Sequence, residues 1–158
     1  MTQREDVARA LAFFAACDDA ILLHQLIAEV APRAKRMVGQ FLAGGDEDAI
    51  PPPSDVRPAR NAATKADALQ TLRRTTDFAL LQVQARTIGQ RVETIEIAAS
   101  AEFPEGSRVT VPTKTTFPPP AQRVSGTIEE TGTSLRVLLD NGETWEGPPS
   151  LARLEGAR

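Results

Sequence analysis

The sequence predicts a mixed α+β fold, in which an antiparallel helical hairpin over residues 1–102 precedes a small five-stranded β-barrel over residues 103–158. Two long segments of the first domain carry apolar side chains at alternating spacings of three and four, the pattern of helices that pack against one another. A proline-rich, acidic connector over residues 45–59 separates them. Beyond Phe103 the pattern changes to short runs of alternating apolar residues between Gly and Pro turn signals, which is typical of a small all-β domain.

The first predicted helix covers residues 2–42. Its apolar seam keeps one heptad phase throughout and consists of Phe13, Ala16, Ala20, Leu23, Ile27, Val30, Ala34, Met37 and Phe41. Pro32 removes one backbone donor, so we expect the helix to kink there or to split at Ala31. Gly44 and Gly45 supply the end of this helix.

The second predicted helix begins near Asn61 or Thr64, where Thr64 and Asp67 loosely match a capping box. Its seam consists of Phe78, Leu81, Ala85, Ile88, Val92, Ile95 and Ala99. Residues 92–97 also alternate as a strand would, but the heptad phase continues through them. We therefore expect helix to about Ala99.

Five short strands are expected after a turn at residues 104–106. They cover residues 107–111, 123–130, 134–139 and 143–146, with a last strand ending near Leu154. A long proline-rich loop joins the first two strands, and the Asp140-Asn141-Gly142 sequence is the strongest hairpin signal in the chain. Short strands joined by tight turns cannot bury both faces of a sheet unless the sheet curls, so we expect closure into a barrel.

Several short motifs place this domain among known folds. They are Gly106-x-Arg108-Val109-x-Val111, Gly126-x-Ile128, Val137-x-Leu139-Asp140-x-Gly142 and Leu151-x-x-Leu154. With the long first loop, they resemble the SH3-like small β-barrel superfold, which includes Tudor, KOW and bacterial SH3-like modules. The resemblance implies a barrel and no particular activity, because this superfold hosts unrelated functions. The chain lacks the Tyr-rich groove of peptide-binding SH3 domains, since it contains no Tyr.

The composition argues against an enzyme, a metal site or a bound cofactor. The single Cys17 and single His24 lie two helical turns apart, about 10 Å, which is too far for a catalytic dyad. Asp18 and Asp19 project in different directions from a helix, and the acidic residues 46–48 lack the ligand spacing of a calcium loop. No glycine-rich loop has the residues that cradle a phosphate. We therefore expect a protein without cofactor or metal.

Charge and hydropathy bear on whether the chain binds nucleic acid or a membrane and on its cellular compartment. The net charge is −3, which does not favour binding of nucleic acid or of an anionic membrane by the whole chain. No apolar run approaches the ~18 residues of a membrane span. The polar, acidic N-terminus does not resemble a signal peptide, so we expect a cytoplasmic protein.

Two kinds of binding surface are predicted. The helical seams expose more apolar surface than one partner helix covers, so we expect a homo-oligomer, most simply a dimer. The residues assigned to this assembly are Phe13, Leu23, Ile27, Val30, Phe78, Leu81 and Ile88. The barrel is expected to bind another protein through Trp145 and Phe117, flanked by Arg108 and Arg123; the alternative is that Trp145 belongs to the barrel core.

The resulting hypothesis is a non-enzymatic, oligomeric adaptor protein. A second hypothesis, which the charge balance does not favour, is a nucleic-acid-associated regulator. In that case the barrel would contact the phosphate backbone through Arg108, Lys114, Arg123 and Arg136.

Overall fold

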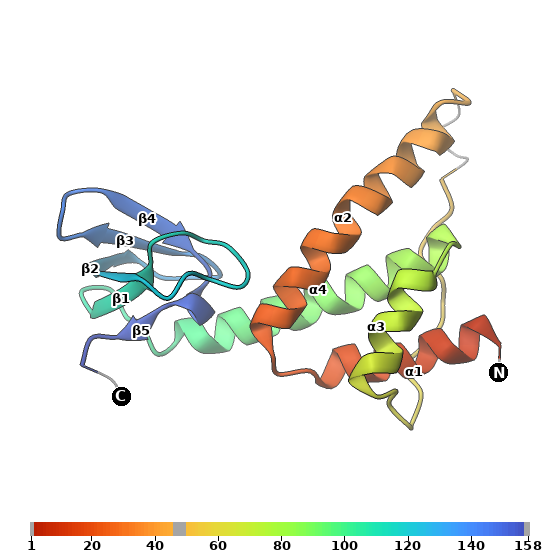
Figure 1. Cartoon of the computed structure of the whole chain (residues 1–158), viewed down its shortest axis with the longest axis horizontal. Coiled ribbons are helices and arrows are strands. Elements are labelled where there is room, and N and C mark those ends of the chain that lie inside the picture. The colour runs from red at the N-terminus through yellow and green to blue at the C-terminus, as the bar shows by residue number, and fades with distance from the viewer. Residues whose placement is uncertain (1, 46–49, 157–158) are drawn as a thin grey trace. The chain divides into compact units, whose positions relative to one another are not determined.

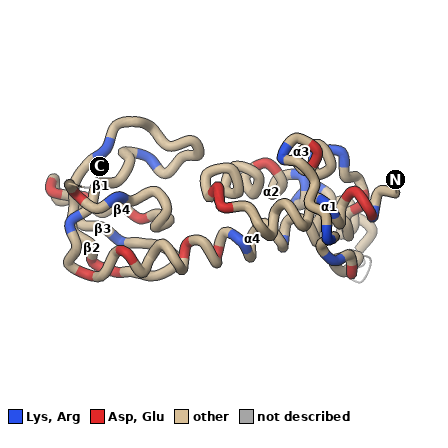
Figure 2. The backbone as a smooth tube through the Cα atoms, turned by 90° about the horizontal axis from the view of Figure 1, so that it is seen from below, with Lys and Arg blue, Asp and Glu red and all other residues tan. Residues whose placement is uncertain are grey.

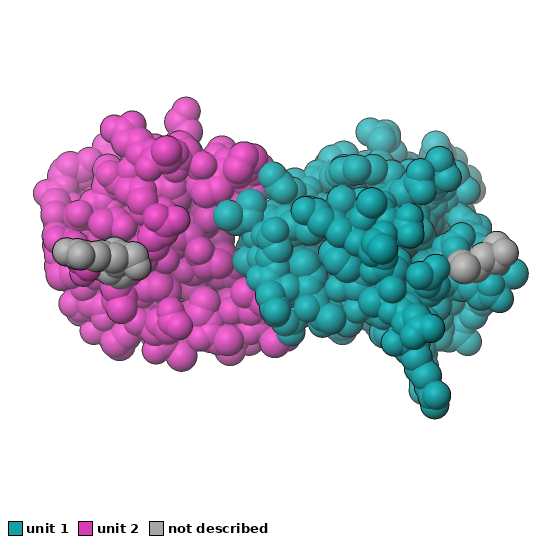
Figure 3. Space-filling model, turned by 60° about the horizontal axis from the view of Figure 1, so that its bottom comes forward, with its two compact units in different colours: residues 1–91 teal, residues 92–158 magenta. Residues whose placement is uncertain are grey.

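The computed structural model describes residues 2–45 and 50–156. Over these residues the fold is mixed α+β, with four α-helices followed by a five-stranded antiparallel sheet (Figure 1). The chain forms two compact units, residues 1–91 and residues 92–158 (Figure 3). We call them the helical unit and the sheet unit. The division lies within the last helix, and the domain boundary expected between residues 102 and 103 stays a prediction.

Helices α1 (Gln3–Ala16) and α2 (Ala20–Leu42) occupy the segment predicted as one helix. The break occurs because Asp19 caps α2: its carboxylate accepts a hydrogen bond from the backbone N–H of Leu22 at 3.0 Å. The split predicted at Ala31 is wrong, since α2 continues through Pro32. The next turn is anchored from outside the helix, where the Arg33 guanidinium donates to the carbonyl oxygens of residues 72 and 75.

Residues 50–64, which include residues 50–59 of the predicted connector, have no helix or strand. The acidic residues 46–48 of the predicted connector lie outside the described residues. The segment is bound to the helices rather than free in solvent: the N–H of Ala59 donates to the carbonyl oxygen of Ala8, and the N–H of Ala63 to that of Arg9, both at 2.9 Å. Val56 packs against an apolar cluster of α1 and α4.

Helices α3 (Lys65–Arg74) and α4 (Phe78–Ser100) occupy the second predicted helical segment. Thr64 caps α3 by accepting from the N–H of Asp67, as the capping pattern predicts. A second capping residue that the seam does not reveal, Asp77, accepts from the N–H of Leu80 at 3.1 Å and starts a new helix. The helix expected to about Ala99 is confirmed, because α4 ends at Ser100.

The sheet follows the predicted strands to within one residue at each described end of its four longer strands. Their bounds are β1 Arg108–Pro112, β2 Arg123–Glu130, β3 Leu135–Leu139 and β4 Thr144–Gly147, followed by a 3₁₀ turn at Pro149–Leu151 and β5 Arg153–Leu154. The strand order is β4-β3-β2-β1-β5, and all neighbours are antiparallel. In the predicted hairpin, Gly142 has a φ of +88°, a conformation that favours glycine.

The sheet is not closed into a barrel, contrary to the sequence-based expectation. Within the described residues β4 and β5 are the two edges of the sheet, and they are only four and two residues long. The core is covered instead by the connecting segments, which contribute Phe103 and Leu151 to the same buried cluster as the strands. The buried Glu96 of α4 accepts hydrogen bonds from the Ser150 backbone N–H, at 2.8 Å, and from the Ser150 hydroxyl.

Candidate functional site

Trp145, the predicted partner anchor on β4, lies in the core of the sheet unit. Its exposed fraction is 6%, and it belongs to the buried cluster of the sheet. The indole ring lies against the backbone of Gly147, where an added Cβ would be 2.7 Å from two ring carbons. The burial supports the alternative that the sequence left open, in which Trp145 is a core residue.

The other predicted anchors of this unit also make contacts within it. Phe117, in the loop between β1 and β2, is half-buried and packs against the same cluster as Trp145. The Arg123 guanidinium donates to the carbonyl oxygens of Thr110, at 2.7 Å, and Leu151, at 2.8 Å. Burial lowers the pKa of Arg123. Arg123 therefore ties β1, β2 and the 3₁₀ turn together.

Arg108 is exposed, but its charge is matched by acidic neighbours. Two of its guanidinium nitrogens each contact a carboxylate oxygen of Asp140 at 2.7 Å, and Nε contacts Glu155 at 3.2 Å. Arg136 of β3 likewise forms ion pairs with two carboxylates, those of Glu146 at 3.0 Å and Glu130 at 3.3 Å. Basic and acidic positions are interspersed along the chain (Figure 2). These pairs leave little of the arginine charge for a phosphate backbone.

The Arg108–Asp140 pair predicts a specific dependence of stability on pH. Hydrogen bonding to Arg108 holds the pKa of Asp140 below its usual value of 3.8. A carboxylate whose pKa is lowered by folding stabilises the folded state above its unfolded pKa, and this contribution is lost as the pH falls through the folded pKa. We expect Asp140→Asn to reduce the acid sensitivity of the sheet unit below about pH 4. Thermal unfolding followed over a pH series checks this. If the variant lost as much stability at low pH as the wild type does, the prediction would be contradicted.

The residues assigned to oligomerisation mostly pack inside the helical unit. Leu23, Val30, Phe78, Leu81 and Ile88 are buried, whereas Phe13 and Ile27 are half-buried. The physical reason is that breaks at residues 17–19 and 75–77 divide the two predicted helices into four. Neighbouring helices of the same chain thus cover most of the seam.

One part of the seam remains open as an apolar groove between α2 and α4. The groove has a volume of about 180 Å³ and is lined by Leu26, Ile27, Val30, Ala31, Ala34, Ala85, Ile88 and Gly89. Ala31 is exposed, and a Cβ added to Gly89 would meet no atom within 4 Å. We call this surface the α2/α4 groove.

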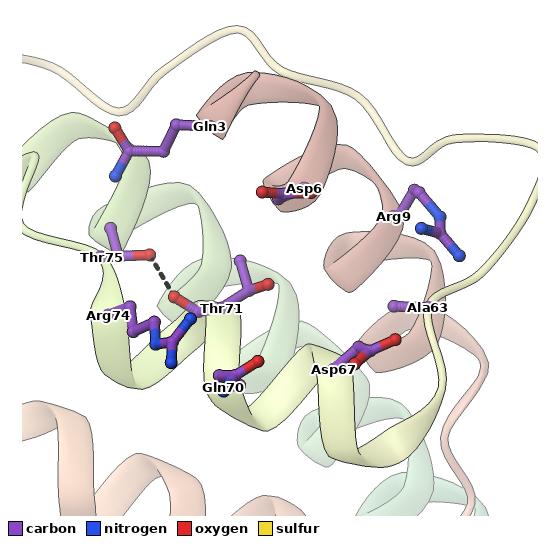
Figure 4. A pocket seen from close by; sticks show the side chains of 9 residues that line it. All are labelled: Gln3, Asp6, Arg9, Ala63, Asp67, Gln70, Thr71, Arg74 and Thr75. Carbon is purple, nitrogen blue, oxygen red and sulfur yellow. Dashed lines mark hydrogen bonds between the residues drawn. The ribbon is translucent and has the colours of Figure 1, made fainter. Parts of the chain in front are cut away.

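A second hollow, which the sequence analysis missed, lies between α1 and α3 and is polar (Figure 4). Its volume is about 300 Å³, and its lining residues are Gln3, Asp6, Arg9, Ala63, Asp67, Gln70, Thr71, Arg74 and Thr75. The available signal was a polar stripe at helical spacing on each helix, which by itself is indistinguishable from a solvated face. Only the packing of α1 against α3 brings the two stripes together.

The described residues contain no group of three or more His, Cys, Asp or Glu side chains placed to hold a metal ion. In the same part of the chain, no helix is both long and apolar enough to cross a membrane. Cys17 is a buried free thiol. No protein-family model, curated protein or solved structure gives a significant match to the chain.

Proposed function

We propose that the protein is a non-enzymatic adaptor that self-associates through its helical unit and binds another protein through its sheet unit. The observation that carries this proposal is the α2/α4 groove. A contiguous apolar hollow on a water-facing surface is typical of interaction sites. Its lining includes residues of both predicted heptad seams, namely Ile27, Val30, Ala34, Ala85 and Ile88.

The groove favours a second copy of the chain as its partner. Ala31, Ala34 and Ala85 are small, so they let another helix approach closely, and Ile27 offers a half-buried apolar side chain. In a two-fold symmetric dimer the same patch lies at the interface on both chains, so each groove is covered by the groove region of the other chain. A dimer is therefore the simplest assembly that covers the groove.

For the sheet unit, we propose an SH3-like module that binds a protein partner. The support for this fold is the role of β1, which pairs with both β2 and β5 and so brings the last strand back beside the first. Support for a binding role comes from β4 and β5, each of which pairs with one neighbouring strand among the described residues and can therefore accept an added strand on its outer edge. Leu138 and Leu154 are also exposed, at 43% and 44%.

The nucleic-acid alternative has less support, because Arg108, Arg123 and Arg136 bond to acceptors of the same unit. Binding to a phosphate backbone would have to compete with these contacts. A steep loss of any measured nucleic-acid affinity with added salt would favour this alternative.

A matched pair of variants tests the groove as the self-association surface. Ala31→Glu places a carboxylate in the groove, whereas Ala28→Glu places the same group on an exposed part of α2 outside it. Burying an unpaired charge costs more than the ~1.4 kcal/mol that corresponds to tenfold in an equilibrium constant. We expect Ala31→Glu to weaken self-association at least about tenfold and Ala28→Glu to leave it unchanged.

Sedimentation velocity over a concentration series measures this effect, with far-ultraviolet circular dichroism to verify that both variants remain helical. Equal weakening by the two variants would contradict the placement of the interface. The placement of the interface would also be contradicted if neither variant altered self-association.

A further inference from the structure

The polar hollow between α1 and α3 has the chemistry of a small-molecule site, which is separate from the function proposed above. We propose that it binds a small zwitterion that carries an ammonium group and a carboxylate at opposite ends. Its volume of about 300 Å³ lies at the lower end of the range for ligand pockets. The lining combines charged groups of both signs with amide and hydroxyl groups.

The charges of the lining select for such a ligand. Asp6 and Asp67 contribute two carboxylates, while Arg9 and Arg74 contribute two guanidinium groups, so the hollow has no net charge. Arg9 has an interaction of its own within the protein. Among the described residues, no ion pair or side-chain hydrogen bond engages the two carboxylates or the Arg74 guanidinium. A simple anion or cation would satisfy only one half of this set.

The two signs of charge are separated along α3. Asp67 and Arg74 are seven residues apart, which corresponds to two helical turns, or about 10 Å. Figure 4 shows the Arg74 guanidinium directed toward Thr71 and Gln70, with Asp6 across from them on α1. A ligand carboxylate at Arg74 and an ammonium group at Asp67 would therefore need an extended spacer, and Asp6 of α1 offers a second carboxylate to the ammonium group. A planar guanidinium can bind a carboxylate in a bidentate fashion.

The floor and walls of the hollow are held by hydrogen bonds. Thr75 is 1% exposed, and its hydroxyl donates to the Thr71 carbonyl oxygen at 2.6 Å and accepts from the amide of Gln84 at 2.9 Å. The Arg33 guanidinium of α2 donates to the Thr75 carbonyl oxygen at 2.8 Å. The N–H of Ala63 is bonded to the carbonyl oxygen of Arg9. A site whose walls are fixed before binding loses less entropy when the ligand enters.

Titration of the full-length, isotope-labelled protein with 4-aminobutanoate and 6-aminohexanoate, followed by amide NMR, tests the proposal. Butanoate, hexanoate and hexylamine at equal concentrations are the singly charged controls. We expect at least one amino acid to give saturable shifts at Ala63, Thr71 and Thr75, with the controls binding at least about tenfold more weakly. Equal binding of the controls, or no saturable shift with either amino acid, would overturn the proposal.

Three variants locate the binding groups. Asp6→Asn and Arg74→Gln are each expected to weaken binding about tenfold or more, since each removes a charge-assisted hydrogen bond. Lys65→Gln removes an exposed charge of α3 that does not line the hollow, so we expect it to bind like the wild type. If Lys65→Gln weakened binding as much as the other two, the attraction would be a general charge effect and the proposed site would be wrong. Amide spectra without ligand verify that all three variants remain folded.

Discussion

Replacing Trp145 by alanine is expected to unfold the sheet unit. Trp145 is only 6% exposed. It contributes the largest aromatic side chain to a cluster that otherwise consists mainly of aliphatic side chains. Truncation of a buried aromatic residue to alanine typically costs about 3–5 kcal/mol, because it removes apolar contacts and leaves a cavity. A small domain has little stability in reserve against such a loss.

Trp145→Phe is the matched control for this prediction. Phenylalanine keeps an aromatic ring, and the lost indole N–H has no hydrogen-bond partner among the described residues. We therefore expect a clearly smaller loss of stability than for alanine. Protection of the β2 and β3 amides against hydrogen exchange measures the stability of the sheet unit in both variants. If Trp145→Ala kept native protection while a protein partner no longer bound, Trp145 would be an interface anchor and not a core residue.

Replacing Leu23 by aspartate is expected to unfold the helical unit. Leu23 is 0% exposed in α2, so the carboxylate would be buried without a partner. Such a charge costs several kcal/mol, which is a large part of the stability of a domain. The loss of helical ellipticity at neutral pH measures the effect.

Leu42→Asp provides the control on the same helix. Leu42 lies at the end of α2 and is 43% exposed, so an aspartate there stays in water. We expect its thermal unfolding to resemble that of the wild type. If Leu23→Asp and Leu42→Asp unfolded at similar temperatures, the burial of the seam inside the helical unit would be contradicted.

The strands were predictable because their signals are local. Gly and Pro turns, the Asp140–Gly142 hairpin and runs of β-branched residues fix where β1 to β4 begin and end. The break at residues 17–19 was missed because the first heptad seam continues in phase across it. The break at residues 75–77 was missed because Leu69 and Leu72 already lie at helical spacing ahead of the seam that begins at Phe78. Asp19 and Asp77 were the available signals, since each accepts from a backbone N–H three residues later. A capping side chain thus outweighs an uninterrupted apolar period.

The binding surfaces were less predictable, for a physical reason. An apolar seam does not specify whether its partner helix belongs to the same chain or to another, so Leu81 and Ile88 were assigned to assembly although the chain buries them itself. Likewise, a large aromatic residue such as Trp145 suits a core and an interface equally well by sequence. The polar hollow depends on two separate helices meeting, and no local pattern encodes that contact.

Sedimentation equilibrium of the full chain measures whether the protein self-associates, as proposed for its helical unit. We expect a mass twice that of the single chain at micromolar concentrations, with dissociation on dilution and in the Ala31→Glu variant. The mass of a single chain at every concentration up to the highest soluble one would contradict it.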